Sequence, residues 1–329
     1  MADITGSAVA SYLGWFLARY LVAVAALYAM SLVSSKAGFA ARLLASWLAL
    51  LVGALYGVLA SVVLTLAGRQ GISQWATARA FKLAMRVATG VTFSVEDPHE
   101  VLDTTRPAVF VGNHQTALDV LMLGCMFPKY CSVTAKTSLK YYPFLGWFMA
   151  LSGTVFIDRS NRNDARQAMS GAADAIRSRR QSVYIFPEGT RSNAQEAMLL
   201  DFKKGAFHLA VQAGVPVVPV VVANYSHVYS VKKWIFRSGT IPIKGEWFPY
   251  RRKTLCASAN TAAVLEPIPT ANLTAEDVPE LTIMVRERML KELVSLTARA
   301  QGLAVAVPSK SQPNGASSTG VEARRTRRA

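Results

Sequence analysis

One long uncharged segment constrains the fold of this chain more than any other feature. Residues 43–68 carry no charged side chain, and about 20 apolar residues suffice for a helix to cross a bilayer. A second apolar stretch, 4–35, holds Arg19 near its middle. Because a charge at the bilayer centre costs roughly 3 kcal/mol, this stretch either spans the membrane or lies in one leaflet with Arg19 reaching the headgroups. We predict a membrane helical hairpin over 1–70 rather than a cleaved signal peptide, because Asp3 and no Lys or Arg precede the apolar stretch.

Charge and cysteine content narrow the classes of partner. The chain has 36 Lys and Arg against 20 Asp and Glu, a formal net charge of +16. This excess indicates anionic partners, namely phosphate, a membrane surface or nucleic acid. A hydrophobic content of 52% excludes disorder as the main state. The three cysteines, Cys125, Cys131 and Cys256, cannot all pair and lack CxxC spacing, so neither a disulfide framework nor a zinc site is predicted.

The segment after the predicted hairpin has a basic helical pattern. In residues 75–90, Arg79, Lys82 and Arg86 recur at helical spacing among apolar residues. This pattern is typical of an amphipathic helix on an anionic bilayer, and it equally fits an ordinary solvated helix face. The position directly after the apolar hairpin favours the membrane interpretation.

Beyond about residue 105 the pattern changes to short apolar runs that alternate with helical stretches. The runs are rich in Val, Ile and Phe and lie at 107–112, 131–135, 153–158, 182–187 and 215–225. The stretches with helical periodicity are 163–180, 203–214 and 275–296. Strands that are apolar throughout indicate a sheet covered on both faces. We therefore predict an α/β domain over 71–302, a mixed and mostly parallel sheet flanked by helices, followed by a disordered basic tail, 303–329.

A histidine and an aspartate follow the first of these runs. His114 and Asp119 are five residues apart, which would place them about 140° apart on a regular helix. They can meet only if His114 lies in the strand–helix turn and Asp119 in the first helical turn, whose side chains lean back toward the N-terminus. Such a pair is a general base, because the carboxylate fixes the imidazole tautomer and stabilises the imidazolium. The alternative is an N-cap at Asn113, an Asp119 that complements the helix dipole and an incidental histidine.

Basic residues and a glycine that permits a turn follow three of the other apolar runs. FPEGTRS (186–192) supplies Gly189 for a turn with exposed N–H groups, Thr190 as a donor and Arg191 as a bidentate fork for phosphate. Arg159 ends the run at 153–158, and Lys136 is a weaker candidate after 131–135. Strand ends meet at one edge of an α/β sheet, where ligands bind, so these cations are predicted to face one anion. Taken alone, either arginine is more often part of a surface salt bridge than a contact to a ligand.

Several familiar sites are absent from the sequence. There is no GxSxG motif, which forms the nucleophile elbow of serine hydrolases, so a hydrolase of that class is not predicted. A P-loop, GxGxxG and HExxH are also missing, so neither a nucleotide cofactor nor a metal is predicted.

Four sequence blocks occur in the same order as in a known family. They are NHQTALD (113–119), GTVFIDR (153–159), FPEGTRS (186–192) and VPVVPVV (215–221). They resemble those of the 1-acylglycerol-3-phosphate acyltransferases of the glycerolipid acyltransferase superfamily, in particular the fungal-type members. HxxxxD alone is a weak signal, whereas HxxxxD with FPEGTR at its proper distance is highly specific. The resemblance covers roughly 20–300.

The resemblance implies acyl transfer from acyl-CoA to lysophosphatidate, with His114 as the base and Asp119 as its orienter. The acceptor's phosphate would be held by Arg159 and by the FPEGTRS residues Glu188, Gly189, Thr190 and Arg191. The strand with Pro216 and Pro219 would help to form an acyl channel. Acyl-CoA is the co-substrate and no further cofactor is implied. The implied location is the endoplasmic reticulum membrane, with the catalytic domain facing the cytosol.

Residues 245–262 depart from the family pattern. This stretch interrupts a short run and lacks strand alternation. It could be encoded with GTGAGT across Gly245–Trp247 and GCTAAC across Ala259–Asn260, the signals of a small fungal intron. We therefore expect that these residues are translated from an intron that the gene model failed to remove. A mature transcript that contains these codons would refute this expectation.

Three alternatives remain open at this point. The same chemistry can act on glycerol 3-phosphate or on a lysophospholipid with a larger headgroup. A basic membrane protein that binds lipid without catalysis is a second alternative, against which the His114–Asp119 pair argues. Nucleic-acid binding is the weakest alternative, since no sequence motif of a nucleic-acid-binding domain accompanies the arginine-rich tail. The sequence does not predict an oligomeric state.

Overall fold

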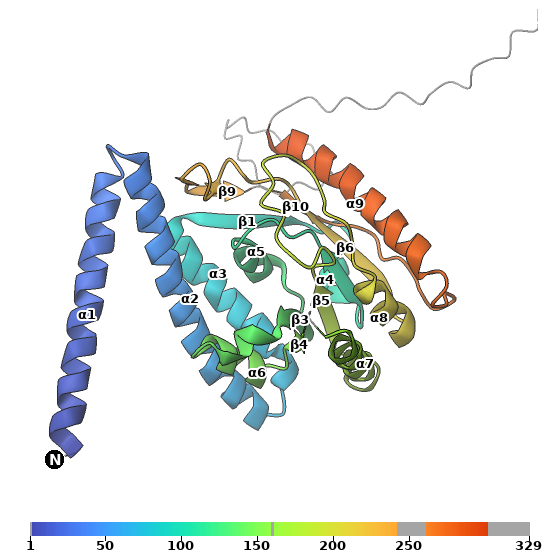
Figure 1. The fold of residues 1–329 in the computed structure, drawn as a ribbon, viewed down its shortest axis with the longest axis horizontal. Coiled ribbons are helices and arrows are strands. Elements are labelled where there is room, and N and C mark those ends of the chain that lie inside the picture. The colour runs from blue at the N-terminus through green and yellow to red at the C-terminus, as the bar shows by residue number, and fades with distance from the viewer. Residues whose placement is uncertain (1, 159–160, 242–260, 302–329) are drawn as a thin grey trace, which may run out of the picture.

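An eight-stranded sheet organises the chain (Figure 1), within the residues that the computed structural model describes, 2–158, 161–241 and 261–301. The strand order is β4-β3-β5-β2-β6-β10-β1-β9, and neighbouring strands are parallel except β6 with β10. The strands are β1 (Val91–Glu96), β2 (Val109–Gly112), β3 (Cys131–Lys136), β4 (Val155–Ile157), β5 (Ser182–Ile185), β6 (Val217–Val222), β9 (Gly239–Ile241) and β10 (Thr261–Val264). A separate two-stranded sheet consists of β7 (Tyr229–Ser230) and β8 (Ile235–Phe236).

Helices cover the sheet and extend beyond it. They are α1 (Ala2–Met30), α2 (Ser35–Leu66), α3 (Ser73–Thr89), α4 (Val101–Thr104), α5 (Asp119–Met126), α6 (Leu145–Leu151), α7 (Arg162–Arg179), α8 (Gly205–Ala213) and α9 (Val278–Ala300). Two short 3₁₀ segments, η1 (Gln70–Ile72) and η2 (Thr137–Tyr141), precede α3 and α6. The mixed, mostly parallel sheet flanked by helices confirms the predicted fold class.

Two hydrophobic cores lie on the two faces of the sheet. Phe110 of β2 packs into the core beneath α3 and α5, together with Met122. Its neighbours Val109 and Val111 point to the other core, beneath α7, α8 and α9, with Phe207. Since successive side chains of a strand alternate between faces, burial on both faces explains why β2 is apolar at every position.

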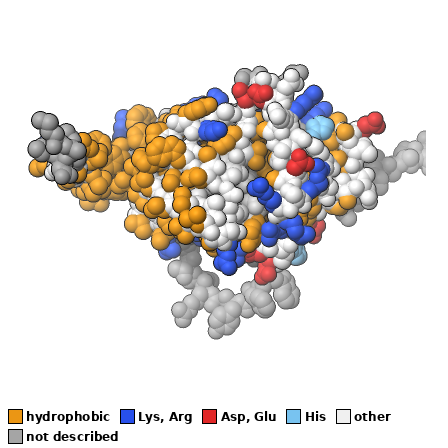
Figure 2. Space-filling model, turned by 90° about the horizontal axis from the view of Figure 1, so that it is seen from below, with side chains coloured by type: hydrophobic (Ala, Val, Ile, Leu, Met, Phe, Trp, Pro, Cys, Tyr) orange, Lys and Arg blue, Asp and Glu red, His pale blue; other side chains and the backbone are white. Residues whose placement is uncertain are grey.

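The first two helices form the predicted hairpin. Ser7–Met30 and Ser35–Leu66 are long and apolar enough to cross a membrane by length and composition. One face of α2 carries mainly small residues, from Ala37 to Ser61, and packs against the α/β domain. The outer faces leave large side chains exposed, and Figure 2 shows hydrophobic side chains gathered over this end of the molecule. Two such helices indicate membrane association.

The five apolar runs predicted as strands correspond to β2, β3, β4, β5 and β6, and the predicted helices to α3, α7, α8 and α9. β1, β9 and β10 were not predicted. Of the atypical stretch 245–262, the last two residues belong to β10 and the others lie outside the described residues. Arg159, Cys256 and the tail 303–329 also lie outside them.

Candidate active site

Parallel strands bring the predicted site residues to one edge of the sheet. β2 leads into His114, β5 leads into FPEGTRS (186–192) and β3 ends at Lys136, in the sheet order β3-β5-β2. Val111 of β2 is in register with Ile185 of β5, so the two following loops begin level with each other. The carboxyl edge of parallel strands is where α/β proteins bind ligands.

His114 and Asp119 form a hydrogen-bonded pair at the start of α5. His114 lies in the turn after β2, and Asp119 is the first residue of α5, which is the arrangement that their five-residue spacing requires. The Nδ1–H of His114 donates to Oδ2 of Asp119 over 2.7 Å. The imidazole stacks on Phe186, with the ring centroids 4.1 Å apart. Its Nε2 has no hydrogen-bond partner in the described part of the chain, and the side chain is 18% exposed, so this nitrogen is available to a substrate.

The carboxylate of Asp119 is fully buried and has donors on both oxygens. Oδ2 also accepts the backbone N–H groups of Gln115 and Thr116, over 2.6 and 3.0 Å. Oδ1 accepts the hydroxyl of Tyr225 over 2.5 Å. Burial and the nearby Asp119 raise the pKa of Tyr225 well above its usual range, so the phenol remains a donor. A carboxylate held by four donors is rigid, and it fixes the tautomer and orientation of His114.

Glu188 connects the FPEGTRS loop to the histidine turn. Its Oε1 accepts the backbone N–H of His114 over 2.7 Å, and its Oε2 accepts that of Leu200 over 3.0 Å. Two backbone bonds reinforce this link, from Ser192 N to the carbonyl of His114 and from Asn193 N to that of Gln115. Burial raises the pKa of Glu188. Within the chain, Glu188 therefore holds two loops together, and its predicted contact with substrate stays a prediction.

A lysine lies over the glycine of this loop. Gly189 has φ +71°, a left-handed conformation that a glycine adopts without strain. A Cβ built at this position would lie 2.9 Å from Cε and 3.1 Å from Nζ of Lys203. The missing side chain thus lets the Lys203 ammonium approach the turn, beside the exposed Thr190 and Arg191.

The other predicted cations occupy neighbouring positions of the same edge. Arg191 lies near enough to Tyr229 for its charge to oppose the rise that burial causes in the pKa of that phenol. Lys136 is exposed at the end of β3, where it is in register with Ile157 of β4. Arg159 follows β4 two residues later but lies outside the described residues, so its approach to Arg191 stays a prediction.

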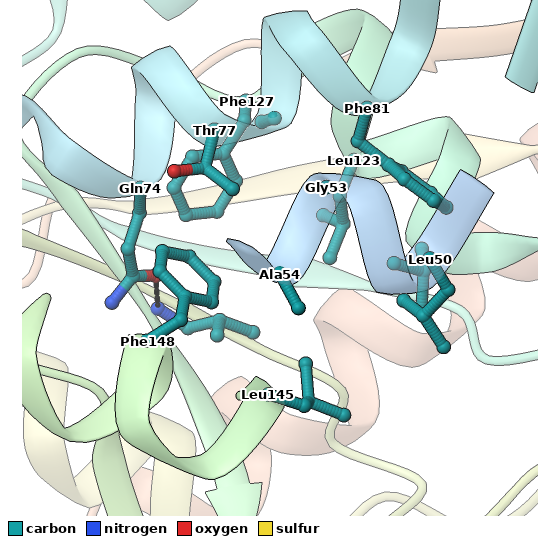
Figure 3. A pocket seen from close by; sticks show the side chains of 13 residues that line it. Leu50, Gly53, Ala54, Gln74, Thr77, Phe81, Leu123, Phe127, Leu145 and Phe148 are labelled. Atoms are coloured by element: carbon teal, nitrogen blue, oxygen red, sulfur yellow. Dashed lines mark hydrogen bonds between the residues drawn. The ribbon is translucent and has the colours of Figure 1, made fainter. Parts of the chain in front are cut away.

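An apolar cavity of about 110 Å³ adjoins α5 (Figure 3). It lies between α2, α3, α5, α6 and β3 and is lined almost entirely by carbon atoms. Val120, the residue after Asp119, belongs to its wall. Figure 3 shows Leu50, Phe81 and Phe148 among the side chains around it. The cavity thus lies between the start of α5 and the face of α2 that packs against the α/β domain.

Sequence reasoning missed the polar contacts that lock the histidine turn. Asn113 does not cap α5, because its side-chain amide instead donates to and accepts from the backbone of Val222. The N-cap interpretation of Asn113 is therefore wrong. Gln115 donates to the carbonyls of Val222 and Ala223. Tyr225 looked like the apolar end of a strand, and the one available signal was that a buried phenol requires a partner.

The chain is similar in sequence to known proteins. A model of the Acyltransferase family matches residues 93–223. The 1-acyl-sn-glycerol-3-phosphate acyltransferase of Saccharomyces cerevisiae is 42% identical over 72% of this chain and 72% of its own length. The human 1-acyl-sn-glycerol-3-phosphate acyltransferase beta is 37% identical over 68% of this chain and 73% of its own.

A solved structure shares the fold. The crystal structure of the 1-acyl-sn-glycerophosphate acyltransferase PlsC from Thermotoga maritima superposes with a TM-score of 0.55 at 20% identity, covering 78% of this chain and 97% of that one. Identities above one third over more than two thirds of the chain are decisive for membership. The chain belongs to the 1-acyl-sn-glycerol-3-phosphate acyltransferase family.

Proposed function

We propose that this protein transfers an acyl chain from acyl-CoA to the sn-2 hydroxyl of 1-acyl-sn-glycerol 3-phosphate, which gives phosphatidate. The observation that carries the proposal is the pair of His114 and a fully buried Asp119, with Nε2 of His114 left without a partner in the described residues. The pair lies at the same sheet edge as the FPEGTRS loop, in a chain whose relatives carry this activity in their names.

His114 would act as the general base. Its Nε2 takes the proton of the acceptor hydroxyl while the oxygen attacks the thioester carbonyl, and the C–O bond forms. The tetrahedral intermediate then collapses, the C–S bond breaks, and the departing thiolate receives the proton from the imidazolium. A thioester is already activated, so no covalent enzyme intermediate is needed. General-base assistance of this kind is typically worth about 10²–10⁴ in rate.

The acceptor's phosphate would bind the cations around the FPEGTRS loop. Arg191 offers a planar fork for two phosphate oxygens, and Lys203 adds a point charge above Gly189. Thr190, Lys136 and the predicted Arg159 complete the group. Glu188 would act mainly by holding the loop against the histidine turn, since both of its oxygens accept backbone N–H groups.

The apolar cavity beside α5 would accommodate part of an acyl chain. Its wall holds Val120, the neighbour of Asp119, and its lining is almost free of polar atoms. Transfer of an acyl chain from water to such an apolar surface is favourable in free energy. A chain entering from the bilayer along α2 would thus reach the edge of the sheet where His114 lies.

The membrane location follows from the same helices. We propose that α1 and α2 insert into the endoplasmic reticulum membrane and that the α/β domain faces the cytosol, where acyl-CoA is found. The excess of basic residues favours this side and the anionic surface of the bilayer.

An acyltransferase assay on membranes that carry this chain tests the proposal. Acyl-CoA is held constant while lysophosphatidate, glycerol 3-phosphate and lysophosphatidylcholine are offered as acceptors, with His114→Ala as the matched control. Turnover of lysophosphatidate at least about 10² times faster than by the control supports the proposal. A preference for another acceptor would instead assign the same chemistry to that acceptor. Equal turnover by both proteins would refute His114 as the base, and no turnover by either protein would leave only lipid binding.

A further inference from the structure

A second cavity lies at the opposite edge of the sheet from His114. Its volume is about 490 Å³, and Ser132, Val155 and Val183, near the starts of β3, β4 and β5, form part of its wall. The segment between α2 and α3 and the end of α7 close the remaining sides. A strand rises about 3.3 Å per residue, so Arg106 in the wall of this cavity, which precedes His114 on the same strand segment, lies on the order of 20 Å from His114. The cavity is therefore separate from the proposed active site.

The charged residues in the wall are all arginines. Arg69, Arg106 and Arg179 line this arginine cavity, and no Asp or Glu does. None of the three forms an ion pair among the described residues. Arg106 is held rigidly, because its Nε–H donates to the carbonyl of Arg180 over 2.8 Å and its guanidinium lies 3.7 Å above the ring of Tyr130. A fixed guanidinium beside two uncompensated ones favours a phosphate-bearing anion.

The arginine cavity also lies where the apolar helix α2 ends. Thr65, in the last turn of α2, belongs to its wall, and Arg69 is the first charged residue after the stretch 43–68. Val63 and Leu66 of the same turn are 62% and 85% exposed. The end of a long apolar helix lies at the depth of the lipid headgroups, where basic pockets bind anionic lipids.

We propose that the arginine cavity binds the phosphate-bearing headgroup of an anionic membrane phospholipid, whose acyl chains lie along the exposed end of α2. Free phosphate carries the same charged group, but it has no acyl chain to contact the exposed Val63 and Leu66. The bound lipid is a ligand that holds this edge of the domain at the bilayer, and its headgroup is too far from His114 to be acylated. The inference does not depend on the proposed function.

Unfolding of the full chain in a neutral detergent tests the proposal. The midpoint temperature is measured with dioleoylphosphatidylserine, with dioleoylphosphatidylcholine and with inorganic phosphate at equal concentrations. Because Arg106 also binds the Arg180 carbonyl, the test variant changes only the two exposed arginines, Arg69→Gln with Arg179→Gln. The control, Arg166→Gln with Arg288→Gln, removes the same charge elsewhere on the surface.

Phosphatidylserine at 5–10 times its dissociation constant should raise the midpoint of the wild type and of the control by about 2–4 °C, and should leave the test variant unchanged. An equal rise in the test variant would overturn the proposal, because the lipid would then bind elsewhere, the active site included. An equal rise with phosphatidylcholine would show that only the tails bind. A rise with inorganic phosphate as large as that with phosphatidylserine would exclude the lipid as the source of the anion.

Discussion

The hydroxyl of Tyr225 donates to Oδ1 of Asp119 while His114 donates to Oδ2, so a single buried carboxylate joins a loop after β6 to the histidine turn. The phenol accepts in turn from the hydroxyl of Thr116, 2.8 Å away. Because Tyr225 is fully buried and its hydroxyl bonds Asp119 rather than the imidazole, it is a positioning residue for the pair.

Tyr225→Phe should lower kcat about tenfold and leave the KM of the acceptor unchanged. The variant keeps the ring but removes one donor to a charged group, a bond worth roughly 1.5–3 kcal/mol that the three remaining donors partly offset. Asp119 would then hold the protonated imidazole more strongly, so the acid limb of the pH–rate profile should move to higher pH. A lower rate with an unmoved acid limb would mean that Tyr225 supports only the fold.

His114→Ala should lower kcat by at least about 10² with little change in the acceptor's KM, since it removes the base and leaves the phosphate site intact. Asp119→Asn should also reduce kcat, because an amide presents N–H groups to donors that need an acceptor. Thermal unfolding of both variants separates lost chemistry from lost folding. Near-full activity of a folded His114→Ala protein would refute the mechanism.

Much of the α/β domain was predictable because its central strands are apolar on both faces. β2, β5 and β6 are buried at every position, and short apolar runs rich in Val and Ile are typical of such strands. β1 was missed because VTFSVE (91–96) alternates apolar with polar residues in place of a continuous apolar run, and β9 and β10 flank a stretch without strand alternation. Pairing of β10 with β1 and β6 is long-range information that no local pattern contains.

The candidate site was predictable where its chemistry is local. His114 and Asp119 are five residues apart, so their spacing limits the geometry. Tyr225 lies 106 positions from Asp119, and the N–H of His114 meets the carboxylate of Glu188 across 74 positions. Lys203 lies close to Gly189, which has no Cβ and adopts a left-handed turn. Such contacts depend on the order of strands in the sheet, which the sequence pattern leaves undetermined.

Arg191→Ala should raise the KM of lysophosphatidate about 10–100-fold, because each charge-assisted hydrogen bond to phosphate is worth roughly 1.5–3 kcal/mol. We expect the same of Arg159→Ala and a smaller rise for Lys203→Gln. Arg191→Lys should restore binding only in part, since a point charge lacks the planar fork. Arg166→Ala is the control for lost charge. Loss of kcat at constant KM would instead assign the arginines to the transition state.

The free energy of unfolding should depend on pH through Glu188. Burial raises the pKa of this carboxyl in the folded chain, so the folded state binds a proton there more readily than the unfolded state. The resulting stability is complete below the ordinary glutamate pKa and is lost as the pH rises to the raised value. Glu188→Gln should remove this pH dependence, whereas the exposed Glu287→Gln should retain it.

At neutral pH, Glu188→Gln should also destabilise the protein by about 1–3 kcal/mol. One backbone N–H, of His114 or Leu200, then faces an amide N–H in place of an acceptor. Chemical denaturation at several pH values measures both effects. An unchanged pH dependence in Glu188→Gln would mean that the carboxyl is equally easy to ionise in the folded and unfolded chains.

Insertion of α1 and α2 into the membrane should shield the turn between them from reagents in the cytosol. Val33, between α1 and α2, is 90% exposed in the isolated chain, and Glu287 on α9 is also exposed. In a Cys256→Ser background, where Cys125 and Cys131 are buried, an impermeant maleimide added to sealed microsomes should label Glu287→Cys and not Val33→Cys. Labelling of Val33→Cys after permeabilisation would show that the hairpin spans the bilayer, whereas continued protection would place the turn within one leaflet. Equal labelling of both positions in sealed microsomes would refute insertion.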